Sequence, residues 1–178
     1  MTSSLPFVEG DEIDESHLPL AFQSPAPAPS SDSDKKLALY VHWPFCVSKC
    51  PYCDFNSHVR ESVDEDLWKD SLLRDMAHEA QATSGRRLTS IFFGGGTPSL
   101  MPPATVAALI KSAEAHWGFD RSIEITLEAN PSSVEAARFA DLAEAGVNRV
   151  SLGLQSLDDA QLRFLGRAHD VQEGLMAL

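Results

Sequence analysis

Three cysteines in one short stretch place the strongest constraint on this chain. Cys46, Cys50 and Cys53 are all the cysteines in its 178 residues, and they follow one another with the spacing C-x3-C-x2-C. Three thiols of one loop cannot all pair as disulfides, and an odd number argues against the disulfide framework of a secreted domain. Thiolates that converge on one centre are typical of zinc and iron–sulfur sites, so the stretch predicts one of these.

The number of thiols leaves two kinds of centre open. A structural zinc site has four ligands, and His42 or His58, which flank the cysteines, could complete a site of three cysteines and one histidine. The alternative is a [4Fe-4S] cluster with three thiolate ligands, since an ordinary cluster of this kind takes four cysteines. Its fourth iron would then stay open for a small molecule, and an open position is typical of a catalytic site.

The rest of the chain alternates strand patterns with helix patterns. Apolar runs predict strands at 37–42, 89–93, 123–127 and 149–153. Helical patterns follow at 62–83, 103–117, 132–146 and 156–165, the first and third opened by the capping boxes Ser62–Glu65 and Ser132–Glu135. Such alternation predicts an α/β fold with parallel strands and right-handed crossovers. Ligands bind β/α barrels at the carboxyl ends of the strands.

Polar and glycine residues follow each predicted strand. Gly94–Pro98 comes directly after the second strand, where glycines allow a ligand to approach the backbone; a tight turn without a ligand is the alternative. Glu128 and Gln155 end the third and fourth strands, and Arg167 could pair with a carboxylate. Each alone is more typical of a solvated surface, but together they predict a pocket. His169 is a weaker candidate.

These motifs resemble a known family. The stretch L-Y-V-H-W-P-F-C-V-S-K-C-P-Y-C-D-F is similar to the signature of the radical S-adenosylmethionine (SAM) superfamily, in particular its oxygen-independent coproporphyrinogen III oxidase-like branch and the HemW-type haem chaperones within it. F-F-G-G-G-T-P-S-L, I-T-L-E-A-N-P and V-S-L-G-L-Q-S support the resemblance, which covers the chain from about Leu37 onward. It implies a partial, open (β/α)6 barrel, of which this chain supplies about four units.

The resemblance also implies a ligand for each motif. Cys46, Cys50 and Cys53 would bind a [4Fe-4S] cluster whose open iron is chelated by SAM, and electron transfer would release a 5′-deoxyadenosyl radical. Tyr40 matches a residue near the methionine part of SAM; the alternative is that it belongs to the core. Tyr52 matches a residue beside the nucleoside of SAM; the alternative is that it forms a hydrophobic lid over the cluster. The other implied SAM contacts are Gly95, Gly96, Thr97, Glu128, Gln155 and Arg167.

Phe55 separates two functions within this branch. The coproporphyrinogen oxidases carry a further cysteine two residues after the last ligand, whereas this chain reads C-D-F. The resemblance therefore implies haem binding and delivery to an acceptor apoprotein, with SAM and haem or porphyrin as small-molecule partners. Oxidative decarboxylation of a porphyrinogen is the alternative, and a zinc-stabilised interaction module is the second alternative.

Charge and composition restrict partners and location. A net charge of -12 opposes nonspecific binding to nucleic acid, and no apolar run approaches the length of a transmembrane segment. The acidic start is unlike a signal or transit peptide, so we expect a cytoplasmic protein. Residues 1–35 are acidic and rich in proline and serine, which predicts a disordered tail before a core at 36–178. Because the chain stops within a helical pattern, we expect a core truncated at its C-terminus.

Overall fold

The main sheet has four parallel strands. The computed structural model describes residues 35–178, so the tail predicted for residues 1–35 lies almost wholly outside the described residues. The strands are β1 (Lys36–Trp43), β4 (Arg87–Gly95), β5 (Phe119–Ala129) and β6 (Arg149–Leu152). They stand in the order β1-β4-β5-β6, and each pair of neighbours is parallel. The predicted α/β class with about four strand–helix units is confirmed.

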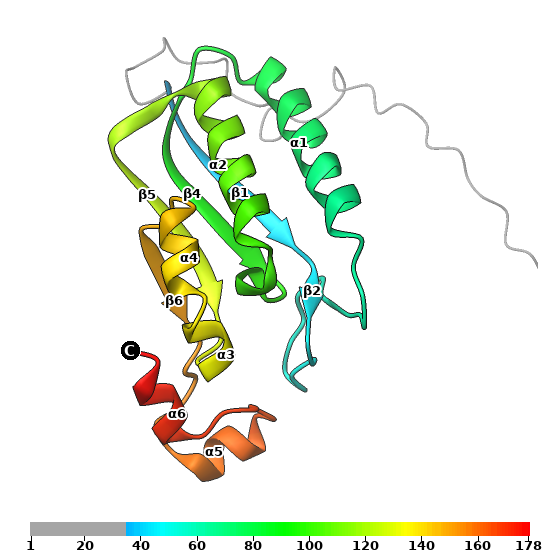
Figure 1. Ribbon diagram of the computed structural model, residues 1–178, viewed down its shortest axis with the longest axis vertical. Coiled ribbons are helices and arrows are strands. Elements are labelled where there is room, and N and C mark those ends of the chain that lie inside the picture. The colour runs from blue at the N-terminus through cyan, green and yellow to red at the C-terminus, as the bar shows by residue number, and fades with distance from the viewer. Residues whose placement is uncertain (1–34) are drawn as a thin grey trace, which may run out of the picture. The chain divides into compact units, whose positions relative to one another are not determined.

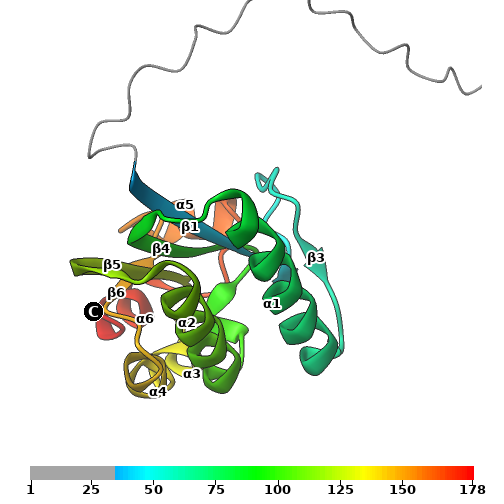
Figure 2. The ribbon, with the colours of Figure 1, turned by 90° about the horizontal axis from the view of Figure 1, so that it is seen from above.

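Helices cover one face of this sheet. α1 (Glu65–Ala82), α2 (Pro103–Trp117) and α4 (Phe139–Glu144) lie on the same side of the strands (Figure 2). Strand residues alternate between buried and exposed, because successive side chains of a strand point to opposite faces. In β1, Val41 and Trp43 are buried and Tyr40 is exposed. Strand side chains such as Ile91 and Leu127 form one apolar core with Leu109 of α2.

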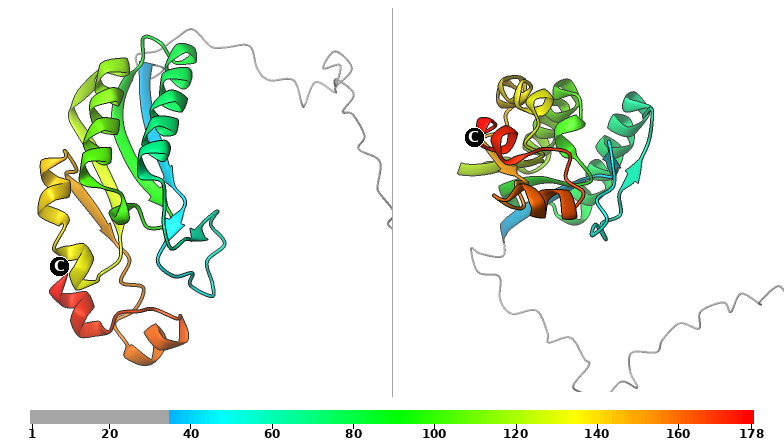
Figure 3. Two further views of the ribbon diagram at one scale, coloured as in Figure 1. Left: turned by 45° about the vertical axis from the view of Figure 1, so that its right-hand side comes forward. Right: turned by 90° about the horizontal axis from the view of Figure 1, so that it is seen from below.

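Short elements gather beyond the carboxyl ends of the strands. A small two-stranded parallel sheet pairs β2 (Phe45–Cys46) with β3 (His58–Val59) and closes the base of the cysteine loop. The 3-10 helix η4 (Pro98–Leu100) follows β4, and α3 (Ser133–Ala136) follows β5. Figures 1 and 3 show α3, α5 (Asp159–Phe164) and α6 (Val171–Met176) past the arrowheads of the long strands.

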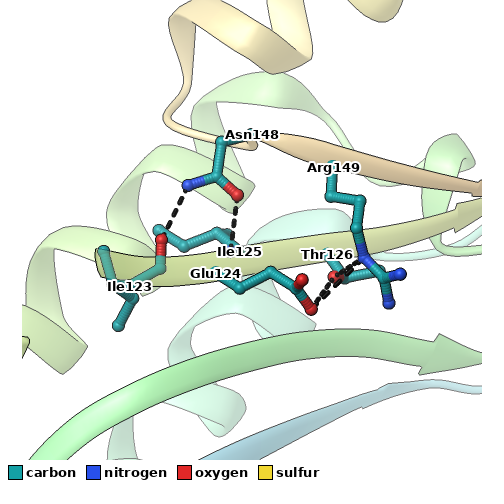
Figure 4. A network of polar contacts seen from close by, with 6 residues as sticks. All are labelled: Ile123, Glu124, Ile125, Thr126, Asn148 and Arg149. Atoms are coloured by element: carbon teal, nitrogen blue, oxygen red, sulfur yellow. Dashed lines mark hydrogen bonds and ion pairs between the residues drawn. The ribbon is translucent and has the colours of Figure 1, made fainter.

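Side chains set the register of β6, which is short. Asn148 bridges the backbone of β5: its Oδ1 accepts from Ile125 N at 2.8 Å, and its Nδ2 donates to Ile123 O at 2.9 Å. The next residue, Arg149, donates through Nε to Thr126 Oγ1 at 2.8 Å and lies 3.2 Å from Glu124 Oε1 (Figure 4). These contacts reinforce the backbone pairing of β6 with β5, which begins at the same residues: Asn148 N donates to Ile125 O at 3.0 Å, and Arg149 pairs with Thr126.

Two helix boundaries differ from those that the sequence predicts. The N-cap of α1 is Asp64, whose side chain accepts from Leu67 N, so the predicted Ser62 cap is wrong. The single helix expected at 132–146 is two, α3 and α4, with Arg138 as the N-cap of the second. The physical reason is that the Arg138 guanidinium donates to the backbone oxygens of Leu100 and Met101, which anchors the break to the η4 turn.

Candidate functional site

A cavity of about 800 Å³ opens at the carboxyl ends of the strands. Residues that lie far apart in the sequence line it together, because parallel strands bring their carboxyl ends to one edge. The candidates among its lining residues are Cys46, Cys50, Tyr52, Cys53, Gly95, Gly96, Thr97, Glu128, Gln155 and Arg167. Tyr40 is the candidate that the structure places outside this lining. Phe55, which separates the two functions of the branch, lies on the cavity wall and is 60% exposed.

The three cysteines are free and half-buried on one wall of the cavity. Cys50 Sγ accepts a hydrogen bond from Arg167 Nη1 at 3.4 Å, and Cys53 Sγ lies 3.7 Å from Ser57 Oγ. Within residues 35–178, no group of three or more His, Cys, Asp or Glu side chains is arranged to hold a metal ion. The three cysteines therefore line one cavity, but their sulfur atoms would have to move closer together to bind one metal centre.

The histidines of the zinc alternative do not face this cavity. His42 and His58 line a separate hollow of about 400 Å³ between the small sheet and the start of α1. Both histidine rings form hydrogen bonds with Asn56: His42 Nε2 lies 2.9 Å from the backbone oxygen of Asn56, and His58 Nε2 lies 3.1 Å from Asn56 Oδ1. Their placement gives no support to a site of three cysteines and one histidine.

Arg167 joins three walls of the cavity. Its Nη2 donates to Asn130 Oδ1 and to Gly153 O, each at 2.8 Å, which ties the ends of β5 and β6 together. Its Nη1 donates to Cys50 Sγ and to Tyr52 Oη, each at 3.4 Å, which reaches the cysteine loop. Its buried Nε has no hydrogen-bond partner among the described residues. A cation that lines a cavity is suited to an anionic group of a ligand.

A buried carboxylate supports the same wall. Glu135 is 6% exposed, and its carboxylate accepts from the Ser99 hydroxyl, from Asn130 N at 2.8 Å and from Asn130 Nδ2 at 3.3 Å. The predicted Ser132 cap is present, since Ser132 Oγ accepts from Glu135 N at 3.2 Å. Asn130 and Glu135 line the cavity, but the sequence indicated Glu135 only as a capping residue, and Asn130 only as part of the I-T-L-E-A-N-P motif without a role of its own.

The run of glycines is required by the protein's own packing. A Cβ on Gly95, whose φ is +115°, would lie 2.7 Å from the ring of His42. A Cβ on Gly96 would lie 2.6 Å from the backbone oxygen of Phe45. The glycines therefore let β4 end close against the first strand and its following loop, and they leave Thr97 buried at the cavity with its backbone N–H bonded to Phe45 O at 2.8 Å.

Tyr40 forms a polar chain beside the cavity. The Asn56 carbonyl is an acceptor, so His42 Nε2 carries the proton and its Nδ1 is free to accept from the Tyr40 hydroxyl at 3.4 Å. Burial first, and the negative charge of Glu128 second, raise the pKa of Tyr40. The pKa of Tyr52 is also raised, mainly by burial, although the neighbouring Arg167 opposes this effect. Both phenols are therefore neutral donors at neutral pH.

Gln155 has a backbone conformation that side chains rarely adopt. Its φ is +65°, the one positive value at a non-glycine residue among the described residues. Such strain persists where surrounding contacts impose it, and it is concentrated at functional sites. His169, the weaker candidate, is buried and donates through Nε2 to Leu154 O at 3.2 Å. It also lines the cavity.

Comparisons with known proteins identify the family. The model of the radical SAM superfamily matches residues 40–178. The chain belongs to this superfamily. Haem chaperone HemW from Escherichia coli is 46% identical over 142 residues, which cover 79% of this chain and 38% of that protein. Radical S-adenosyl methionine domain-containing protein 1, mitochondrial, from Bos taurus is 44% identical over 156 residues, which cover 88% of this chain and 34% of that protein.

A solved structure shows the same fold as this radical SAM chain. Coproporphyrinogen III oxidase (HemN) from Escherichia coli, described as a radical SAM enzyme, superposes with a TM-score of 0.70 at 30% identity. The match covers 79% of this chain and 32% of that structure. The chain thus spans about a third of the length of the relatives and the structure it matches. None of the helices in the described part of the chain is long and apolar enough to cross a membrane.

Proposed function

We propose that this radical SAM chain binds a [4Fe-4S] cluster and SAM in the strand-end cavity and serves haem binding and delivery. The observation that carries the proposal is that three free cysteines line the same cavity as Gly95–Thr97, Glu128, Gln155 and Arg167. Three thiols without a fourth cysteine suit a cluster that keeps one iron open. A [4Fe-4S] cluster bound in this way would supply the electron that breaks a carbon–sulfur bond of SAM.

The residues around the cysteines suit such a cluster. The thiols are free and partly exposed, and the Arg167 guanidinium lies 3.4 Å from Cys50 Sγ, where it offsets negative charge on a thiolate loop. Pro44 precedes the loop and Pro51 lies within it, and the pairing of β2 with β3 closes its base. The loop would draw the three sulfurs of Cys46, Cys50 and Cys53 together around the cluster.

The other polar groups of the cavity suit a zwitterionic nucleoside ligand. Arg167 provides a cation for a carboxylate, and Glu128 provides an acceptor for an ammonium or a ribose hydroxyl. Gln155 provides both donors and an acceptor from its strained position. Tyr52 and the backbone of Gly95, Gly96 and Thr97 complete the wall. Tyr40 would contact this ligand only if the cavity extended over the exposed face of β1.

Haem delivery is favoured over porphyrinogen oxidation by Phe55, which lies two residues after the last cysteine. Phe55 occupies the position of the further cysteine of the oxidase branch, and its ring is 60% exposed at the cavity. A relative named haem chaperone HemW is 46% identical. We expect haem or a porphyrin as the second small molecule and a haem-accepting apoprotein as the protein partner. The oxidase reaction is the alternative, which the likeness to HemN keeps open.

The cluster is tested by anaerobic reconstitution with iron and sulfide. We expect a brown protein with broad absorption near 400 nm, roughly where thiolate-ligated clusters absorb. Replacing Cys46, Cys50 or Cys53 with Ala should each abolish the absorption, whereas His58→Ala, as the matched control, should leave it unchanged. A colourless protein with one zinc per chain, lost in the His58 variant, would instead establish the zinc-stabilised module.

Two measurements on the reconstituted protein distinguish the haem-carrier hypothesis from the coproporphyrinogen-oxidase hypothesis. Haem titration should give a saturable spectral change, and coproporphyrinogen with SAM and a reductant should remain unchanged. Multiple turnovers to a decarboxylated product would establish the oxidase reading. Phe55→Cys tests whether the added thiol introduces turnover, with Phe55→Ser as its control.

Location stays a prediction. The acidic composition of the first residues predicts the cytoplasm, while the name of the bovine relative refers to mitochondria. Fractionation of the native cells with markers for both compartments distinguishes the two outcomes.

A further inference from the structure

We infer that Glu135 positions Arg167 indirectly, by fixing the orientation of the Asn130 amide between them. The inference rests on the proposed function in one respect, because it takes Arg167 to face the carboxylate of SAM. It assigns a role to Glu135 and Asn130, two cavity residues that do not belong to the cysteine, glycine or Gln155 motifs.

The first step is the set of donors around Glu135. One carboxylate oxygen, Oε2, accepts from the Ser99 hydroxyl and from the backbone N–H of Asn130 at 2.8 Å. The other oxygen, Oε1, accepts from Asn130 Nδ2 at 3.3 Å and from the Ser132 hydroxyl at 3.5 Å. An ionised carboxylate can accept at both oxygens, so it satisfies all four donors at once. A group that is 6% exposed cannot replace such partners with bulk water.

The second step is the amide of Asn130. Its Nδ2 faces Glu135 Oε1 and also donates to Thr97 Oγ1 at 3.4 Å, so its Oδ1 is turned to the opposite side. There Oδ1 accepts from Arg167 Nη2 at 2.8 Å. The amide can accept from the guanidinium only in this orientation, because a flipped amide would present Nδ2–H to Nη2–H. The negative charge at Glu135 thereby selects the orientation that holds Arg167.

The third step is what Arg167 does when held. With Nη2 on Asn130 Oδ1 and Gly153 O, its Nη1 is directed to Cys50 and Tyr52. Without the bond to Asn130 the guanidinium would no longer be held in this orientation, because an arginine side chain has many rotamers and fixing one of them costs conformational entropy. Glu135 is therefore a positioning residue for a SAM contact, and it acts through Asn130 without touching the ligand.

The neutral variant Glu135→Gln tests this chain of contacts. Gln has one acceptor oxygen, and the fixed backbone N–H of Asn130 takes it, so the Gln amide nitrogen must face Asn130 Nδ2. The Asn130 side chain then has to flip, and its Nδ2 opposes Arg167 Nη2. In the double variant Glu135→Gln/Asn130→Asp, an aspartate accepts from both the Gln amide and the guanidinium. This exchange keeps the net charge and restores complementary partners.

SAM affinity of the reconstituted chain is measured by anaerobic calorimetry for the wild type and these variants. Loss of one hydrogen bond to a charged group predicts about ten- to hundredfold weaker SAM binding for Glu135→Gln. The double variant should return to within a few-fold of the wild type. Glu124→Gln is the matched control, because this carboxylate lies on the same strand β5 but pairs with Arg149 outside the cavity, and its SAM affinity should be unchanged.

Two outcomes would overturn the inference. One is wild-type SAM affinity in a folded Glu135→Gln variant. The other is a double variant that gives no rescue: it binds SAM as weakly as Glu135→Gln, or it fails to fold when Glu135→Gln also fails. That result would mean that the carboxylate at position 135 is needed only for the structure. Thermal unfolding of each variant separates weaker binding from lost structure.

A second measurement does not depend on SAM. In cluster-free protein labelled with 15N-arginine, Arg167 is assigned by the signal that Arg167→Lys removes. We expect slow rotation of its guanidinium in the wild type and in the double variant, and fast rotation in Glu135→Gln. If the wild type binds no SAM, the proposed function fails while this rotation still decides the inference; equal rotation in all variants would overturn it.

Discussion

The first three strands and the segment after β6 are stabilised in different ways. β1, β4 and β5 bury apolar side chains completely against α1 and α2: Leu88, Phe93 and Leu127 are each 0% exposed. In residues 153–178, Phe164 is 87% and Met176 is 70% exposed. Leu162 is the one buried large apolar side chain of that segment, at 1% exposure, and it does not belong to the main core cluster. Polar contacts add to its attachment, such as those of Arg167 with Gly153 O and Asn130.

The difference matters because the cavity draws its walls from both regions. Gly95, Thr97 and Glu128 lie at the ends of β4 and β5, whereas Gln155 and Arg167 belong to residues 153–178. Segments with few buried apolar contacts open with lower free energy than core strands. We therefore expect one wall of the site to be rigid and the other to close on a ligand.

The largest effect should come from the core. Leu127→Ala removes a completely buried side chain of β5 and should lower the free energy of unfolding by about 2–5 kcal/mol. Phe164→Ala, on the exposed face of α5, should change it by less than about 0.5 kcal/mol. Urea unfolding followed by far-ultraviolet circular dichroism measures both. Similar losses in the two variants would contradict the contrast between the regions.

A smaller effect should arise where the second region is attached. Arg167→Gln removes the charged donor to Asn130 and Gly153, and should lower the local opening free energy of residues 153–178 by about 1.5–3 kcal/mol. Hydrogen exchange should become faster in that segment and stay unchanged in β1, β4 and β5. Arg163→Gln, an exposed position of α5, is the control; faster exchange throughout the molecule would show that the segment is part of the main cooperative unit.

The junction of the two regions lies at Asn148. Asn148→Ala leaves the backbone N–H of the buried residue Ile125 without its acceptor and should cost about 1–3 kcal/mol (Figure 4). Asn148→Asp keeps that acceptor but loses the donor to Ile123 O, so its cost should be intermediate. The free energy of unfolding checks this order. If the two variants were equally stable, the bond to Ile125 would not set the register of β6.

The smallest effect concerns pH. The chain has two tyrosines, Tyr40 and Tyr52, and both should ionise above the ordinary value of 10.0 because burial raises each pKa. When folding raises a pKa, the protonated group stabilises the folded state at pH values below the pKa of the unfolded state. This contribution is lost as the pH rises through the pKa of the folded state. Absorbance at about 295 nm, a wavelength at which tyrosinate absorbs, follows both groups.

Substitutions assign the two titrations. Tyr52→Phe leaves Tyr40 alone, and Glu128→Gln should then lower the midpoint of Tyr40 without bringing it to 10.0, since burial is the larger cause. A midpoint that Glu128→Gln does not move would show that the carboxylate is too well solvated to act on Tyr40.

The order of the main strands and helices, and the loop with the cysteines, follow from sequence patterns alone. These features are local: apolar periodicity and Gly118 define α2 as Pro103–Trp117, as predicted, and the cysteine spacing lies within one loop. The parallel alternation also predicts that Glu128, Gln155 and Arg167 lie at one edge of the sheet. The carboxyl ends of parallel strands meet at that edge whatever the side chains are.

The contacts among those residues depend on the tertiary structure. The pairing of β2 with β3 and the bond from Arg167 to Asn130 join residues that are distant in sequence. His42 and His58, although near the cysteines in sequence, line a separate hollow. Glu135 shows why: its capping pattern is local, but its carboxylate also serves Ser99 on another loop. Side chains satisfy their hydrogen bonds with whichever partners folding brings near, and no sequence pattern encodes that choice.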